Sequence, residues 1–143
     1  MKFVDFHPTQ EEIMSLIEYA RDEGLLKKTN VVPNIQLCHM FLDHPSFHKL
    51  SRICNTHPNS IRQRLLKSAR NIHWHKMGVE ENLFKLPTRI CMTLFRNEIT
   101  TTAQLQEVHN KKNHLGEHIG YENVKGLGDL AIDKIEEYLE FDV

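Results

Sequence analysis

The sequence has no acidic residue from His44 to Val79, a stretch of 36 residues in a chain of 143. Seven Lys and Arg side chains fall in that stretch, although the whole chain is close to neutral, with 18 basic and 19 acidic residues. A concentrated positive charge on a small helical segment is typical of a surface that binds nucleic acid. The missing acids therefore predict a DNA-binding surface here, and the alternative is an ordinary solvated basic face.

Cysteine is scarce and unpaired. Cys38, Cys54 and Cys91 lie far apart and form no CxxC pair, so neither a disulfide scaffold nor a zinc site of paired cysteines is expected. A reducing, cytoplasmic location fits this usage. The sequence also lacks an apolar leader and any run of about 18 apolar residues, so we expect no membrane association.

Sequence signatures of catalysis are missing as well. The chain contains no nucleophile motif, no phosphate-binding loop and no dinucleotide fingerprint. Ten histidines are present, but none follows a known zinc spacing with paired cysteines. We therefore expect a protein that is not an enzyme and that needs no cofactor or metal.

Strand signals are absent, whereas apolar residues at helical spacing recur along the chain, so we predict an all-α fold. Thr9 and Glu12 have the spacing of a capping box at the start of the first helix. Gly24 is placed to end that helix. The expected helices cover residues 9–24, 33–42, 47–54, 58–77, 86–96, 103–108 and 129–141.

Charge divides the chain into two halves. Residues 1–80 hold eleven basic and eight acidic side chains, whereas residues 81–143 hold seven and eleven. We predict a helical domain over residues 1–79 and a second domain over residues 86–143, joined by a short polar connector near residues 78–85. The basic half is expected to carry the DNA surface and the acidic half to be mostly a solvated body.

The basic segment reads as a short helix, a polar turn and a second helix, the arrangement of a helix-turn-helix. Leu50 and Ile53 on the first helix and Ile61 and Leu65 on the second are expected to clamp the pair. Ser68, Ala69 and Ile72 extend the inward stripe. The residue types that face outward suit base edges and phosphates. The candidate base readers are Asn59, Arg62, Gln63 and Lys67, and the candidate phosphate contacts are Lys49, Arg52, Ser60 and Arg70.

The segment from Lys49 to Trp74 resembles the C-terminal DNA-binding domain of the sporulation master response regulators of spore-forming bacteria. The resemblance lies in the apolar-clamped turn, in arginines at positions 62 and 64, and in the tryptophan near the end of the second helix. It implies that this second helix is a recognition helix in the major groove. The receiver domain of those regulators has no counterpart here, so we expect no control by aspartyl phosphorylation.

Residues 86–105 and 124–139 resemble the C-terminal domain of the bacterial RNA polymerase α subunit. The shared pattern is a Leu-x-x-Arg that ends at Arg89, an Ile-Thr turn, and a Gly-Leu-Gly hairpin before the last helix. The resemblance implies a helix-hairpin-helix in which Arg89 enters the DNA minor groove. It also implies that backbone amides at Gly128 contact the DNA backbone.

The sequence departs from that family at several contact positions. Met92 stands where the family has a DNA-contacting Asn, and Leu130 and Ala131 replace its hairpin Lys and Ser. Asp129 places an acid beside the expected phosphate site. Contact of this half with DNA and contact with another protein therefore stay open as alternatives.

Taken together, these patterns predict a bacterial or bacteriophage transcription regulator that binds double-stranded DNA through a helix-turn-helix. RNA polymerase or a sigma factor is the expected protein partner, and binding to paired half-sites would make the protein a homodimer. The competing hypothesis is an adaptor that mimics the polymerase α domain and engages the transcription machinery without reading DNA.

Overall fold

The protein is all-helical in a computed structural model that describes residues 6–142, which confirms the predicted fold class. These residues contain seven α-helices, three short 3₁₀ segments and no strand; one isolated antiparallel bridge joins Lys112 and His118. The chain divides into two compact units, Phe6–Met77 and the described residues from Gly78 onward. None of the helices in residues 6–142 is long and apolar enough to cross a membrane.

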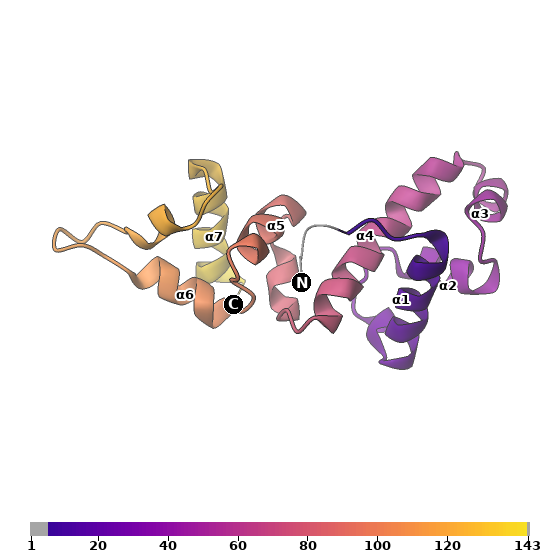
Figure 1. The fold of residues 1–143 in the computed structure, drawn as a ribbon, viewed down its shortest axis with the longest axis horizontal. Helices are drawn as coiled ribbons and strands as arrows, with labels where there is room; N and C mark the ends of the chain where they lie inside the picture. Colours follow the sequence, from indigo (N-terminus) through magenta and orange to yellow (C-terminus); the bar gives the residue numbers. More distant parts are fainter. Residues whose placement is uncertain (1–5, 143) are drawn as a thin grey trace. The chain divides into compact units, whose positions relative to one another are not determined.

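The first unit is built around its longest helix, with the other helices packed against it (Figure 1). Its first helix begins with the capping box: the hydroxyl of Thr9 accepts from the Glu12 amide at 3.1 Å, and the Glu12 carboxylate accepts from the Thr9 amide at 3.0 Å. Gly24 follows this helix in the left-handed conformation (φ +73°). The elements are α1 (Gln10–Asp22), η1 (Leu25–Lys27), α2 (Ile35–Asp43), α3 (Phe47–Ile53) and α4 (Pro58–Lys76).

The core of the first unit consists of apolar side chains from all four helices. Trp74 and Phe41 are its largest members and are almost completely buried. The inward stripe predicted for α4 is confirmed, because every one of its members is fully buried. That stripe comprises Ile61, Leu65, Ser68, Ala69 and Ile72. Burial of so much apolar surface along one helix fixes the orientation of α4, and with it the face that α4 presents to solvent.

The second unit contains η2 (Glu81–Lys85), α5 (Thr88–Arg96), α6 (Thr102–Asn110), η3 (Gly120–Asn123) and α7 (Asp129–Phe141). The segment predicted to be a polar connector is part of this unit instead. Val79 and Leu83 are buried, and the Leu83 carbonyl accepts from the Cys91 thiol at 3.2 Å. The side-chain amide of Asn82 donates to the Tyr138 hydroxyl at 2.8 Å. Two apolar side chains four residues apart thus anchor a stretch that is otherwise polar.

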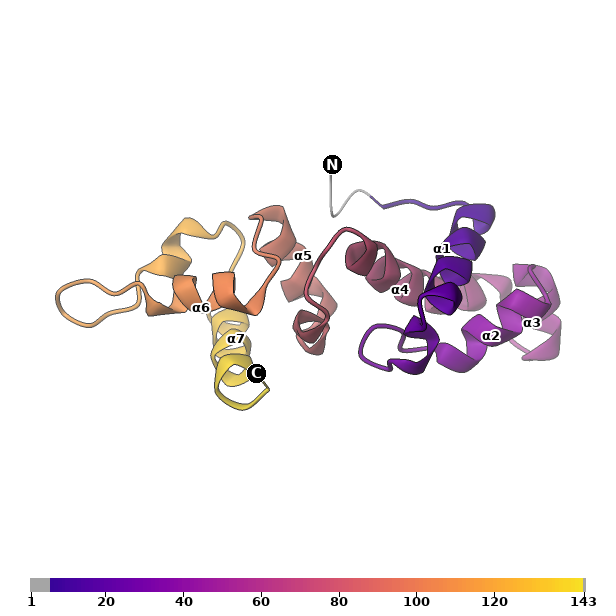
Figure 2. The same ribbon diagram turned by 90° about the horizontal axis from the view of Figure 1, so that it is seen from below.

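Residues 111–119 form a narrow loop that projects beyond the end of α6 (Figures 1 and 2). The bridge between Lys112 and His118 closes its base, and Leu115 near its tip is exposed. The helix predicted over residues 103–108 is one residue longer at its start and two residues longer at its end, since α6 runs from Thr102 to Asn110. The chain returns from the loop to Gly120, which packs directly against Val108 in the last turns of α6.

Gly120 is expected to tolerate no larger residue. A Cβ atom placed on it would overlap the backbone carbonyl oxygen of Val108, so Gly120→Ala would push the two backbone segments apart. We expect the substitution to lower the free energy of unfolding of the second unit by about 2 kcal/mol, as overpacking does elsewhere. Thermal unfolding followed by circular dichroism would measure this.

Gly128→Ser is the matched control, since an added Cβ there meets nothing within 4 Å. Serine is also a favourable residue at the N-cap position that Gly128 occupies. An equal loss of stability in both variants would contradict the close packing of Gly120 on α6.

The three cysteines are free and differ in environment. Cys38 and Cys91 are buried, and burial raises the pKa of the Cys38 thiol to about 11 and that of the Cys91 thiol to about 12. Cys54 is only half-buried and follows the last residue of α3.

Candidate nucleic-acid interface

Helices α3 and α4 are joined by a four-residue turn whose backbone is held by hydrogen bonds. The Cys54 amide donates to the Leu50 carbonyl at 2.8 Å, and the Thr56 amide donates to the Ser51 carbonyl at 2.9 Å. Asn55 takes the left-handed conformation (φ +51°), which asparagine adopts more readily than most residues. The turn is therefore a defined structure that sets the angle between the two helices.

Both helices begin at a side-chain cap. The Ser46 hydroxyl accepts from the Lys49 amide at 3.3 Å at the start of α3. At the start of α4, Nδ1 of His57 accepts from the Asn59 amide at 3.1 Å, and Pro58 occupies the first turn. The helix begins at Pro58, and the residue immediately before it, His57, is therefore the N-cap.

The apolar clamp between α3 and α4 differs from the predicted one at a single residue. Leu50, Ile61 and Leu65 are fully buried, as expected, but Ile53 is 53% exposed. The face of α3 that packs inward contains Leu50 and Ser51 rather than Leu50 and Ile53. At about 100° per residue, Ile53 lies on the far side of Leu50 from Ser51, and it therefore falls outside the contact.

Three of the predicted base readers form one row along the first turns of α4. Asn59, Gln63 and Lys67 are spaced four residues apart, are all exposed, and lie within about 80° of arc on the helix. Arg70 falls inside the same arc one turn further on and is half-buried, and this burial lowers its pKa. Arg62 does not share the row: it is half-buried and lies about 100° around the helix from Gln63.

The remaining candidates lie on both helices. Lys49 and Arg52 are exposed on α3, and Ser60 is half-buried beside the row on α4. Arg64 is not among the predicted contact residues, yet its side chain is exposed on the opposite side of the row from Arg62. Its place in the acid-free stretch was the signal that could have identified it. We call the Lys and Arg residues of α3 and of α4 as far as Arg70 the basic surface: Lys49, Arg52, Arg62, Arg64, Lys67 and Arg70.

The charges of the basic surface are not neutralised within the described part of the chain. None of its six cations has a carboxylate within 4.0 Å among residues 6–142, where ion pairs of other residues do occur, such as Arg21 with Asp22 at 3.1 Å. Lys76, further along α4, lies 5.0 Å from the ring centre of Tyr19 instead. A group of cations held close together without counter-ions attracts an external polyanion.

In the second unit, the predicted contact residues lie on different elements. Arg89 is exposed in the first turn of α5, and Gly128 is the N-cap of α7. Gly126, not Gly128, takes the left-handed conformation (φ +96°), whereas Gly128 is extended and would accept any residue. Asp129 is exposed at the start of α7, so an acid stands beside the backbone amides expected to meet a phosphate.

Hydrogen bonds from Asn97 hold the Gly126 turn against the end of α5, and we did not predict this residue from the sequence. The side-chain nitrogen Nδ2 of Asn97 donates to the Lys125 backbone carbonyl at 3.2 Å, and the Lys125 backbone amide donates to the side-chain oxygen Oδ1 of Asn97 at 3.3 Å. A Cβ atom on Gly126 would lie 3.3 Å from the methyl of Thr93, which is one turn from Arg89 on the same helix. The turn therefore packs against the helix that carries Arg89.

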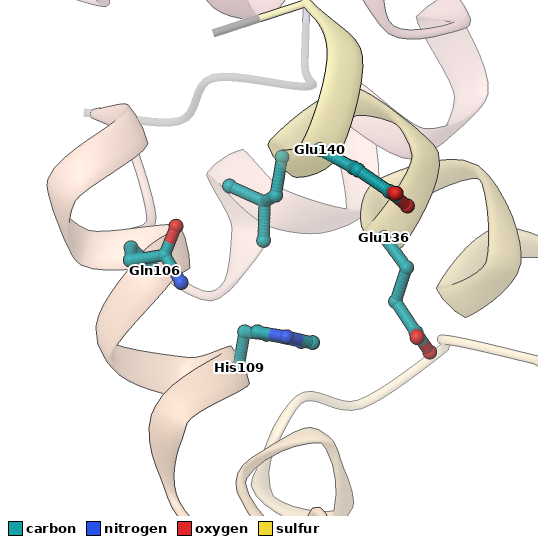
Figure 3. A pocket seen from close by; sticks show the side chains of 5 residues that line it. Gln106, His109, Glu136 and Glu140 are labelled. Carbon is teal, nitrogen blue, oxygen red and sulfur yellow. The ribbon is translucent and has the colours of Figure 1, made fainter.

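A hollow of about 270 Å³ lies between α6 and α7 of the second unit (Figure 3). Gln106 and His109 line it from α6, and Glu136, Leu139 and Glu140 line it from α7. Nδ1 of His109 lies 2.9 Å from the Tyr121 hydroxyl. Burial lowers the pKa of His109, and the neighbouring His118 lowers it further. The neutral imidazole is thus favoured, and the hollow has an acidic rim that contrasts with the basic surface.

No family model, curated protein or solved structure matches the chain.

Proposed function

We propose that α3, the turn and α4 form a helix-turn-helix that binds double-stranded DNA in the major groove, and that the protein is a transcription regulator. The observation that carries this proposal is the exposed row of Asn59, Gln63 and Lys67 on α4, flanked by cations without ion-pair partners. Recognition helices use their first turns to reach base edges, while the preceding helix contacts the DNA backbone. Lys49 and Arg52 on α3 then hold phosphates, as do Ser60 and Arg70 on α4.

The second unit takes an auxiliary role in this proposal. Its turn at Gly126, fastened to α5, supports a helix-hairpin-helix like that of the polymerase α C-terminal domain. Arg89 is exposed and suits a phosphate or a minor groove, with backbone amides near Gly128 as a second contact. Two copies bound to paired half-sites make the functional unit a homodimer.

A second candidate function is an adaptor that engages RNA polymerase or a sigma factor through the second unit. The observation in its favour is the outer face of α7, where Leu130 is 83% exposed on a helix with several exposed carboxylates. An exposed apolar side chain beside like charges suits a protein partner better than it suits DNA. The exposed acids of this helix are Asp129, Asp133, Glu136, Glu137 and Glu140.

Charge reversal on α4 separates the two functions. The double variant Arg64→Glu, Lys67→Glu places two acids on the exposed side of α4 without touching the core. We expect it to weaken binding to a duplex at low salt by on the order of a hundredfold, because two phosphate contacts become repulsions. Fluorescence anisotropy with a labelled duplex of random sequence measures this.

The control reverses the same amount of charge elsewhere in the same unit. Lys27→Glu, Lys28→Glu changes two exposed residues in and after η1, outside α3 and α4. We expect it to alter affinity by less than about threefold. Equal binding by both double variants would overturn the DNA-binding proposal and favour the adaptor.

A further inference from the structure

The first two members of the row on α4 are side-chain amides with no partner in the described chain. Asn59 and Gln63 are exposed, and neither side chain makes a hydrogen bond within residues 6–142. The helix cap does not use Asn59, because His57 supplies the capping atom. The side-chain amides of Asn59 and Gln63, each with a donor and an acceptor, are thus available in the turns that a recognition helix places in the major groove.

An amide is chemically matched to one base in the major groove. Asn and Gln can each accept from the N6 amino group of adenine and donate to its N7. Four residues of helix rise about 6 Å, somewhat less than two base-pair steps of about 3.4 Å. Asn59 and Gln63 are therefore spaced to meet bases one or two steps apart along the groove.

The arginines nearest to this pair lie on its two sides. Arg62 is about 60° around the helix from Asn59 and about 100° from Gln63, and Arg64 is about 100° from Gln63 on the other side. Side chains that diverge in this way face the two walls of a groove, where the phosphates lie, rather than its floor. Lys67, third in the row, is suited to guanine or to a phosphate. Asn59 and Gln63 are thus the central outward side chains of the first two turns, with one arginine on each side.

From this arrangement we infer that the helix selects A·T base pairs at two neighbouring or next-neighbouring positions, with Asn59 and Gln63 each contacting one adenine. The inference rests on the proposed DNA binding and adds the identity of the bases. Arg62 and Arg64 contribute affinity for duplex DNA of any sequence, whereas the two amides contribute the preference.

Selection of bound sequences from random duplex DNA, with the full chain at physiological salt, tests this directly. The expected result is a motif with two A·T positions no more than two steps apart. Replacing either pair by G·C should weaken binding about 5- to 150-fold. A motif that lacks A·T at such positions would overturn the inference, and so would binding without any sequence preference.

Substitutions show which base position of the motif each of the two amide residues reads. Asn59→Ala and Gln63→Ala should each remove the preference at a different position, and Gln63→Arg should change its position from adenine to guanine. Arg64→Ala is the control, because it should weaken binding to every sequence alike. Circular dichroism and Trp74 fluorescence verify that each variant is folded. An unchanged motif in both alanine variants overturns the inference while DNA binding stands; absence of any duplex binding by the unaltered protein overturns the proposed function itself.

Discussion

Raising monovalent salt from 50 to 200 mM is expected to weaken duplex binding about 2,000-fold. Six cations of the basic surface are proposed to reach phosphates: Lys49, Arg52, Arg62, Arg64, Lys67 and Arg70. Each neutralised phosphate releases condensed counter-ions, so the logarithm of the affinity falls with the logarithm of salt at a slope of about −0.9 per contact. Six contacts give a slope near −5.4, and a fourfold rise in salt then has the stated effect.

A salt titration of several variants makes this prediction sharp. Arg52→Ala and Lys49→Ala should each make the slope shallower by about 0.9, because each removes one contact from α3. Lys27→Ala lies outside α3 and α4 and should leave the slope unchanged. A slope shallower than about −2 for the unaltered protein would show that most of these cations do not touch DNA.

The second large effect concerns stability and separates two residues on α3. Leu50→Ala is expected to lower the free energy of unfolding of the first unit by about 3 kcal/mol, because Leu50 is fully buried and its loss leaves a cavity. Ile53→Ala, three residues away, should change it by less than about 0.5 kcal/mol, since that side chain is half in solvent. Leu50 and Ile53 lie on the same helix and differ in how far their side chains are buried, so the comparison isolates the effect of burial.

Urea unfolding followed by tryptophan fluorescence measures this cleanly. The protein has a single tryptophan, Trp74, which is 1% exposed in the first unit, so its signal reports that unit alone. The midpoint should shift strongly for Leu50→Ala and hardly at all for Ile53→Ala. Similar shifts in both variants would mean that Ile53 does belong to the clamp, as the sequence pattern suggested.

The helices themselves could be predicted because their determinants are local. The capping box of Thr9 and Glu12, and the apolar spacing of Ile61, Leu65 and Ile72, lie within a few residues of the feature they specify. Hydrogen bonds in a helix join residues four apart, so the sequence window that encodes them is short.

The predictions were wrong where the burial of a side chain depends on a segment far away in the sequence. Ile53 has the spacing of a core residue, but the direction from which α4 approaches α3 makes Ser51 the buried neighbour of Leu50 instead. Residues 78–85 look polar, yet Val79 and Leu83 find apolar partners elsewhere in the second unit. Such partners are far away in sequence, and no local pattern reveals them.

In the candidate site, too, some features follow from the local sequence and others depend on packing. The acid-free stretch identified the cations, since charge is a property of composition. The row itself follows from the four-residue spacing, but the exposure of each side chain depends on the face that α4 buries, and this leaves Arg62 half-buried and Arg64 exposed. The DNA-contact role of all these residues stays a prediction.

The three cysteines differ in burial, so one of them, Cys54, offers a natural site for attaching a probe. Only a thiolate reacts readily, and Cys38 and Cys91 are both enclosed and hard to ionise. A maleimide dye or nitroxide spin label should therefore attach first at Cys54, where α3 meets the turn. Spectroscopic distances from that point to a labelled duplex could be measured on the natural sequence, without introducing a cysteine.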